Sequence, residues 1–130
     1  MLATHSSTLF NTVPPQDFGH FFNNGEPDSK KVLKFLKYGN EDIAKATNIP
    51  IKSVRYDEKM PSELKERLTE WAIAINLVMG FFNKNQEKTV LWFSIPNPLL
   101  GDISPKDMIR MGRFKKLLKF IQTALDENQR

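Results

Sequence analysis

The stretch LKERLTEWAIAINLVMGFF, residues 64–82, decides the fold that the sequence predicts. Its apolar residues recur every three or four positions, which is the spacing of one face of an α-helix. From Trp71 to Phe82 the stretch is apolar almost all round, so a helix there has no face suited to water. This apolar part is too short to span a bilayer. We therefore predict a long helix that starts near Pro61 and runs through the middle of a protein core.

Helical patterns also precede and follow this central segment, and no alternating pattern of useful length indicates a β-strand. Capping residues mark the expected helix ends, with Ser, Asp or Asn before a helix and Gly after it. The further helices are expected at residues 28–39, from 40, from 50, at 86–93, from 104 and after 112. The predicted fold class is all-α, with a helix-turn-helix module joined by the long buried helix to a small C-terminal helical domain.

The length of 130 residues allows one compact domain, or two very small ones that share a core. The first 27 residues are rich in Ser, Thr, Asn and Pro, which predicts a flexible arm. Within it, Phe18, Phe21 and Phe22 have helical spacing and could dock as one short turn. The expected divisions are residues 1–27 for the arm, 28–60 for the helix-turn-helix module and 61–130 for the helical C-terminal domain.

The composition limits the possible chemistry and location of the chain. There is no cysteine, which excludes disulfides, thiolate chemistry and cysteine-based zinc sites. The first residues contain neither a basic leader nor an apolar run, so we expect no signal peptide, no membrane association and a cytoplasmic location. Two basic zones, residues 30–59 and 105–130, each carry a net charge of +4. Either zone could bind a polyanion, or could be a solvated helix face.

Residues 41–56, EDIAKATNIPIKSVRY, have the spacing of a DNA-binding helix-turn-helix. This motif needs a small residue in its first helix, a turn residue that tolerates left-handed backbone, and buried apolar residues after the turn. Ala44 supplies the small residue, Asn48 the turn, and Ile49 and Val54 the buried positions. The second helix would expose side chains that contact phosphates or base edges. The residues predicted to bind DNA are Lys45, Lys52, Ser53, Arg55, Tyr56 and Lys59.

The same spacing also fits a helical hairpin with no role in DNA binding, and this interpretation stays open. The acids Asp57 and Glu58 follow the second helix directly and would repel phosphate. One copy of the module should therefore bind weakly. If the chain binds DNA, we expect a homodimer that contacts two half-sites.

The sequence does not contain the side-chain patterns of a common enzyme site. Its two histidines, His5 and His20, both fall in the predicted arm, which is not the rigid scaffold that catalysis or metal binding requires. No Gly-rich phosphate loop, nucleophile elbow or HExxH motif occurs. Glu63, Glu66 and Glu70 recur at helical spacing among basic residues, which is typical of an exposed face with charge pairs. We therefore expect neither catalytic activity nor a cofactor.

The segment SIPNPLLGDISPKDMIRM, residues 94–111, combines prolines with large aliphatic residues. The prolines end the preceding helix, because proline cannot donate a backbone hydrogen bond. Ser104 then caps a new helix with proline at its first position, and the apolar residues flanking this cap have the spacing of a hydrophobic staple. Two leucines are left to explain. We expect Leu100 to seal the core and Leu99 to lie at an interface.

The residues around this segment resemble the toxin-binding domain of Xre/MbcA/ParS-type antitoxins. The shared pattern is W-[FL]-x-x-P-N-x-x-L-G, then a Thr/Ser-Pro helix start and a terminal amphipathic helix. It matches here at Trp92, Phe93, Pro96, Asn97, Leu100, Gly101, Ser104 and Pro105. The Xre-like helix-turn-helix and the connecting helix stand upstream in the order that the family shows, so the resemblance covers roughly residues 28–126. Asp102 stands where the family often has a second glycine.

The resemblance implies an antitoxin of a type II toxin-antitoxin system. Such antitoxins form homodimers, occlude the active site of a RES-domain toxin that consumes NAD or modifies proteins with it, and repress their own operon by binding operator DNA. The implied toxin-binding residues are Asn97, Leu99, Arg110, Arg113, Lys115 and Lys116, and the structural anchors are Trp92, Leu100 and Gly101. We interpret Trp92 as a buried core residue rather than a contact. The alternative function is a stand-alone transcriptional regulator whose C-terminal domain only dimerises.

Overall fold

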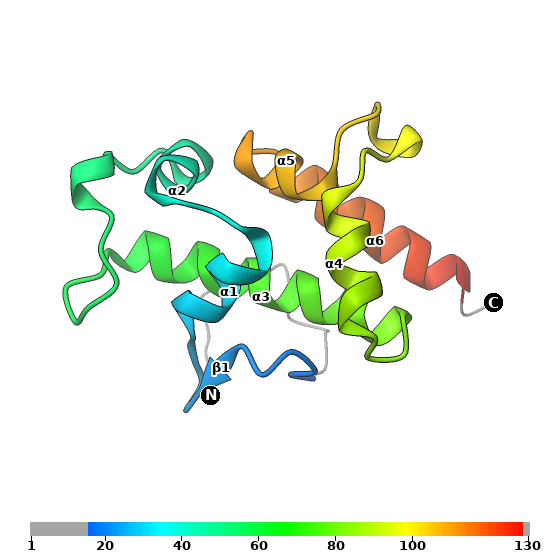
Figure 1. Ribbon diagram of the computed structural model, residues 1–130, viewed down its shortest axis with the longest axis horizontal. Coiled ribbons are helices and arrows are strands. Elements are labelled where there is room, and N and C mark those ends of the chain that lie inside the picture. The colour runs from blue at the N-terminus through cyan, green and yellow to red at the C-terminus, as the bar shows by residue number, and fades with distance from the viewer. Residues whose placement is uncertain (1–15, 129–130) are drawn as a thin grey trace.

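Helix α3 (Ser62–Phe81) is the long helix that the sequence predicts, and it is the longest element of the computed structural model, which describes residues 16–128. The other α-helices of these residues are α1 (Ser29–Leu36), α2 (Asn40–Thr47), α4 (Gln86–Ser94), α5 (Pro105–Arg110) and α6 (Phe114–Asn128) (Figure 1). Two short 3-10 helices, η2 (Ile51–Ser53) and η3 (Pro98–Leu100), and an antiparallel hairpin of β1 (Phe22–Asn23) and β2 (Glu26–Pro27) complete the described part. The all-α fold class is confirmed.

Helix α3 is the centre of the packing. Helices α1, α2, α4 and α6 and strand β2 all contact it, as Figure 1 allows the reader to follow. Buried positions occur on every side of α3, including residues 70–72 and 74–76. A helix packed on one face only would leave some of these consecutive positions in water. The apolar second half of α3 therefore runs through the core, as predicted.

The helix starts follow local capping chemistry. The side chains of Asp28 and Ser104 accept hydrogen bonds from backbone N–H groups in the first turns of α1 and α5. At α2 the N-cap is Gly39, one residue before Asn40, and its N–H donates to the Asp42 carboxylate at 2.9 Å. Each side-chain bond satisfies a backbone group that a helix end leaves without an intrahelical partner. This is why the sequence alone located most of the helix starts.

Residues 16–27 are folded onto α3, so the prediction of a flexible arm is wrong for this part. The side-chain amide of the buried Asn76 donates to the Asp17 carboxylate at 3.1 Å, and its carbonyl oxygen accepts from the N–H of Gly19 at 2.9 Å. The same carboxylate accepts from the N–H of Phe21 at 2.8 Å. A buried amide with both groups bonded stabilises its partners strongly. The polar composition hid this contact because it depends on a residue some 57 positions away.

The aromatic residues of this segment pack against the core, although not in the helical turn expected from their spacing. Phe21 is buried, and the ring of Phe18 lies so close to α3 that a Cβ on Gly80 would come within 2.8 Å of it. Phe22 lies in the β1–β2 hairpin and is half-buried. The remainder of the predicted arm, residues 1–15, lies outside the described residues.

A continuous hydrophobic core contains residues from both predicted domains, 28–60 and 61–130. The ring of Phe35 on α1 packs edge-on against Phe93 on α4, with ring centroids 5.7 Å apart. Edge-on packing of aromatic rings is favourable because the ring edge is positive and the ring face negative. The two regions of the chain are thus held together by direct side-chain packing as well as by the chain connection.

Tyr38 makes a second connection between the two regions. It lies between α1 and α2, packs edge-on against Trp71 of α3, and donates its hydroxyl hydrogen bond to the backbone carbonyl of Lys106 in α5. Burial raises the pKa of Tyr38 above its usual value, and the negative charge of Asp107 raises it further. The hydroxyl therefore stays protonated and remains a donor at neutral pH.

Candidate functional site

The turn of the predicted helix-turn-helix has the expected geometry. Asn48 ends α2 in the left-handed conformation, with φ 62° and ψ 24°, and its N–H donates to the carbonyl of Ala44. Ile49 and Val54 are buried, as the motif requires. Thr47 is buried beside them, where its hydroxyl donates to the Ile43 carbonyl at 2.7 Å. The first helix and the turn are therefore those of the predicted motif.

The second helix of the motif differs from the prediction. The helix expected from Pro50 consists of one 3-10 turn, η2, and Val54 is already extended with φ −77° and ψ 112°. The chain then turns again, with the N–H of Met60 donating to the carbonyl of Asp57 at 2.9 Å. With Val54 extended and a new turn closing at Met60, no second helical turn forms after η2. A recognition helix presents side chains over several turns, and η2 has only one.

The predicted DNA-binding residues therefore lie on three segments instead of one helix face. Lys45 lies on α2, Lys52 and Ser53 on η2, and the others in the loop that follows. In that loop Arg55 binds Asp57 through two hydrogen bonds, of 2.8 and 2.5 Å. The pair raises the pKa of the Arg55 guanidinium and lowers the pKa of the Asp57 carboxyl. Of the two basic residues in this loop, Arg55 and Lys59, Arg55 is thus neutralised by the neighbouring Asp57.

The hydroxyl of Tyr56 is also engaged within the chain. It donates to the side-chain carbonyl of Asn40 at 3.0 Å, and partial burial raises the pKa of Tyr56. Lys45, Lys52 and Lys59 are exposed. Of the six residues predicted to bind DNA, these three lysines keep both their exposure and their charge.

Helix α4 and η3 carry an apolar surface that the fold does not bury. Leu91 is 57% exposed, Ile95 47% and Leu99 78%. Leu91 lies on α4, Ile95 is the C-cap of that helix, and Leu99 lies in η3, which follows after a proline-containing turn. Single exposed apolar residues are ordinary, but several large ones close together in the chain suggest a binding surface. We call Leu91, Ile95, Leu99 and the groove beside them the α4–η3 surface.

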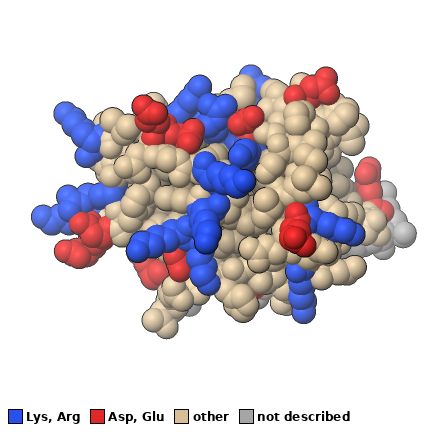
Figure 2. Space-filling view, viewed as in Figure 1, with Lys and Arg blue, Asp and Glu red and all other residues tan. Residues whose placement is uncertain are grey.

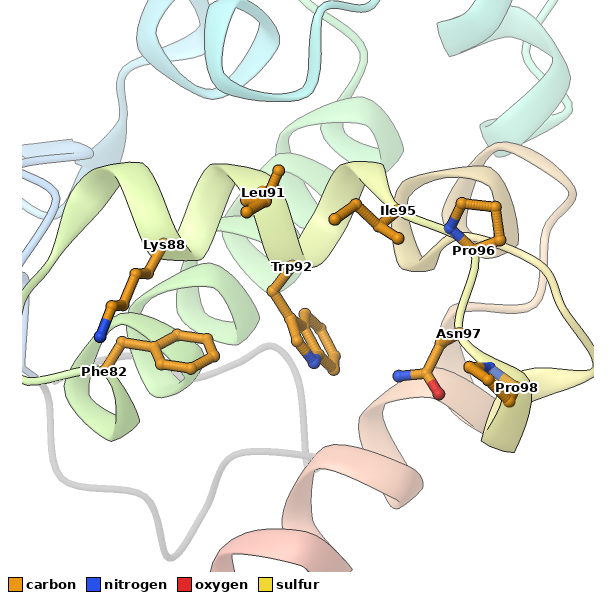
Figure 3. A pocket seen from close by; sticks show the side chains of 8 residues that line it. All are labelled: Phe82, Lys88, Leu91, Trp92, Ile95, Pro96, Asn97 and Pro98. Atoms are coloured by element: carbon orange, nitrogen blue, oxygen red, sulfur yellow. The ribbon is translucent and has the colours of Figure 1, made fainter.

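The groove of the α4–η3 surface is open and mainly apolar, with a volume of about 360 Å³. Figure 3 shows the rings of Phe82 and Trp92 beneath α4, with Lys88 at one end and Asn97 and Pro98 at the other. A mainly apolar groove of this size has room for apolar groups of a binding partner. Sequence reasoning missed Phe82, Lys88, Leu91 and Ile95, although the i, i+4 spacing of the last two was readable.

The loop that carries Leu99 is held in place by Asn97. Its side chain accepts from the N–H of Leu99 at 2.9 Å, and its backbone N–H donates to the carbonyl of Ile103 at 3.1 Å. Gly101 and Asp102 are both left-handed, with φ 76° and 63°. Asp102 thus adopts a conformation that glycine favours and that aspartate tolerates better than most other residues. The loop is a fixed support for an exposed leucine.

The predicted structural anchors, Trp92, Leu100 and Gly101, are not buried as fully as the sequence suggested. Phe93 is 1% exposed and is the buried aromatic residue of α4, whereas Trp92 is half-buried and lines the groove. The interpretation of Trp92 as a buried core residue is therefore correct only in part, because its side chain packs against the core and also lines the groove. Leu100 is half-buried against the core, and Gly101 is exposed at the turn.

The predicted toxin-binding residues do not lie together. Asn97 and Leu99 belong to the loop before α5, whereas the basic residues lie at the other end of α5, in its last turn, just before α6 and in the first turn of α6 (Figure 1). Arg110 binds Asp107 at 3.2 Å. The exposed bases at the start of α6 are Arg113, Lys115 and Lys116.

Glu70 is not on an exposed face, as its spacing had suggested. Of the three glutamates assigned to an exposed face, it is only 5% exposed, and its carboxylate binds the Nε of Arg67 at 2.8 Å. A buried carboxylate with a bidentate guanidinium partner is satisfied where it stands, so it has a structural role.

Neither a metal site nor a membrane-spanning helix is found within residues 16–128. Among these residues no group of three or more His, Asp or Glu side chains could hold a metal ion. His20 is exposed, and His5 lies outside the described residues. None of the described helices has both the length and the apolar character needed to cross a bilayer.

Comparison of the chain with protein-family models, with curated proteins and with solved structures gave no match.

Proposed function

We propose that this protein is an antitoxin that captures a RES-domain toxin through the α4–η3 surface. The observation that supports the proposal is the 78% exposure of Leu99 at the tip of a loop fixed by Asn97. Exposing a large aliphatic side chain on a rigid support costs solvation free energy, and that cost is recovered when a partner covers it. A protein partner fits this surface better than a small polar ligand does.

The α4–η3 surface also has the anatomy of a protein interface. Aromatic residues with part of their area exposed, such as Trp92, are enriched among the residues that dominate binding energy. Exposed aliphatic residues surround it, and Lys88 lies at the groove rim. In the proposed complex this surface lies over the active-site cleft of the toxin and excludes its substrate. The antitoxin itself needs neither a cofactor nor a catalytic group, and it acts in the cytoplasm.

DNA binding is the second proposed activity. The left-handed Asn48 and the buried Ile49 and Val54 support it, because these features set the angle between the two helices of a helix-turn-helix. We propose that a homodimer binds operator DNA and represses the operon. Because η2 is a single turn, contacts with base edges are few, and most of the affinity comes from phosphate contacts.

Co-expression with the product of the neighbouring gene tests the antitoxin proposal. If that product is toxic, production of this chain should restore growth, and the two proteins should purify together. Failure to rescue growth, with both proteins present and folded, would contradict the proposal.

The alternative, a regulator whose C-terminal domain only dimerises, predicts a different result. A second copy would then cover the α4–η3 surface. Leu99→Glu would convert a dimer into a monomer in sedimentation experiments, and no toxic neighbour would be found.

A further inference from the structure

Helix α1 carries a row of lysines without acidic partners. Lys30 and Lys34 are one helical turn apart, and Lys37 caps the same helix at its C-terminal end. All three are exposed, and among the described residues none of them takes part in an ion pair or a side-chain hydrogen bond. Lys31, one position away, differs: its ammonium group donates to the backbone carbonyl of His20 at 3.1 Å.

The lysine row has no role in packing. The buried residues of α1, Val32, Phe35 and Leu36, occupy the opposite face of the helix. Lys30 and Lys34 are one turn apart and repel each other, whereas Lys34 and Lys37 lie at the C-terminal end of α1, where the helix dipole favours positive charge. Figure 2 shows basic side chains gathered near the middle of the face that carries α1. The fold does not use these exposed charges for packing or pairing, so they are available to a polyanionic ligand.

The surroundings of the row distinguish between classes of polyanion. Single-stranded nucleic acid is bound by aromatic side chains on which bases stack. Here Phe35 is buried, and the ring of Tyr38 packs against Trp71. Insertion of an amphipathic helix into a membrane surface uses exposed apolar residues beside the lysines, and α1 offers none, since Leu33 is half-buried. An acidic protein interface usually excludes lysine from its centre. The phosphate backbone of a duplex requires only exposed point charges, and these are present.

We propose that Lys30, Lys34 and Lys37 bind the phosphate backbone of double-stranded DNA, with α1 lying across it. A rise of about 1.5 Å per residue places Lys30 and Lys37 about 10 Å apart along the helix axis, so the row spans several phosphates. The inference rests on the DNA binding proposed above. It assigns the main phosphate contact to α1, and not to the loop in which Asp57 neutralises Arg55.

The experiment compares double variants of equal charge. Lys30→Gln with Lys34→Gln removes two of the three lysines of the row, and Lys84→Gln with Lys119→Gln removes two exposed lysines elsewhere. A third protein, Lys52→Gln with Lys59→Gln, removes lysines of the sequence-predicted surface. Each protein is titrated into a short fluorescent DNA duplex over a series of salt concentrations, because phosphate contacts do not depend on sequence. Circular dichroism and thermal unfolding establish that every variant is folded.

The α1 variant should bind the duplex roughly tenfold or more weakly, and its plot of log K against log salt should lose about 1.8 of its slope, or 0.9 for each contact. The Lys84/Lys119 variant should stay close to the unchanged protein. Equal losses in these two would overturn the inference, because net charge alone would explain them. Loss only in the Lys52/Lys59 variant would also overturn it, while DNA binding itself would stand. A protein that does not bind the duplex, or that prefers single-stranded RNA, would overturn both the inference and DNA binding, and toxin capture would be unaffected.

Discussion

The helix-turn-helix segment, residues 41–56, and the α4–η3 surface each begin from a sequence signature, but the structure uses their side chains in opposite ways. In the first, two of the side chains predicted to bind DNA are bonded within the chain, Arg55 to Asp57 and Tyr56 to Asn40, and only the lysines stay available. In the second, large apolar side chains remain without a covering surface. The difference teaches that a motif predicts backbone geometry better than it predicts which side chains are free to bind.

The largest effect expected within this comparison is on stability. Phe93→Ala should lower the free energy of unfolding by about 3–5 kcal/mol, because it leaves a cavity in the core. Trp92→Ala should cost clearly less, since much of this ring faces an open groove. Urea unfolding of both variants measures the contrast. Equal losses would restore Trp92 to the role of core anchor and remove it from the proposed binding surface.

A smaller effect is expected at the turn of the helix-turn-helix segment. Asn48→Ala should cost about 1 kcal/mol, because alanine disfavours the left-handed conformation that this position adopts. Asn48→Gly should cost less than Asn48→Ala, since glycine accepts this conformation freely. The midpoints of thermal unfolding compare the two variants. If alanine and glycine behave alike, the turn is not held in the observed conformation.

The smallest effect concerns the pair between Arg55 and Asp57. Asp57→Asn should release the guanidinium, and the slope of log K against log salt for duplex binding should become steeper by about 0.9, the value of one added phosphate contact. An unchanged slope would mean that this loop does not face DNA.

The pair should also respond to pH. Its contribution to stability is present above the ordinary pKa of an aspartate and is lost as the pH falls through the lowered pKa of Asp57 in the folded protein. Following the Asp57 carboxyl by NMR during an acid titration measures that pKa. A value at or above that of an unfolded chain would show that the pair does not form in solution.

Much of the fold could be predicted because its signals are local. Ser104 caps α5, and Asn48 turns the chain after α2. An almost entirely apolar run places α3 at the centre of the core. Each of these signals acts within a few residues. The order of residues 16–27 could not be predicted, since it depends on Asn76, far away in the sequence. The length of the second motif helix was misjudged because a helix-turn-helix pattern carries no information on where the second helix ends.

The candidate site was harder to predict for a related reason. Leu99 was expected at an interface, and it is exposed, because a proline-set loop leaves few places to bury it. The choice between Trp92 and Phe93 could not be made from adjacent positions on one helix. Only the packing of Phe35 against Phe93 decides which of the two faces the core. The distance between Leu99 and the basic residues of α6 likewise follows from tertiary structure.

The central claim, that the α4–η3 surface binds the toxin, is tested most directly by a binding titration of Leu99→Glu against the co-purifying toxin. Ile51→Glu is the matched control, because Ile51 is an exposed aliphatic residue on η2, outside the surface. Leu99→Glu should weaken binding by about 2 kcal/mol or more, roughly 30-fold, while the control binds normally and both proteins remain folded. Unchanged binding by Leu99→Glu, or an equal loss in both variants, would contradict the claim.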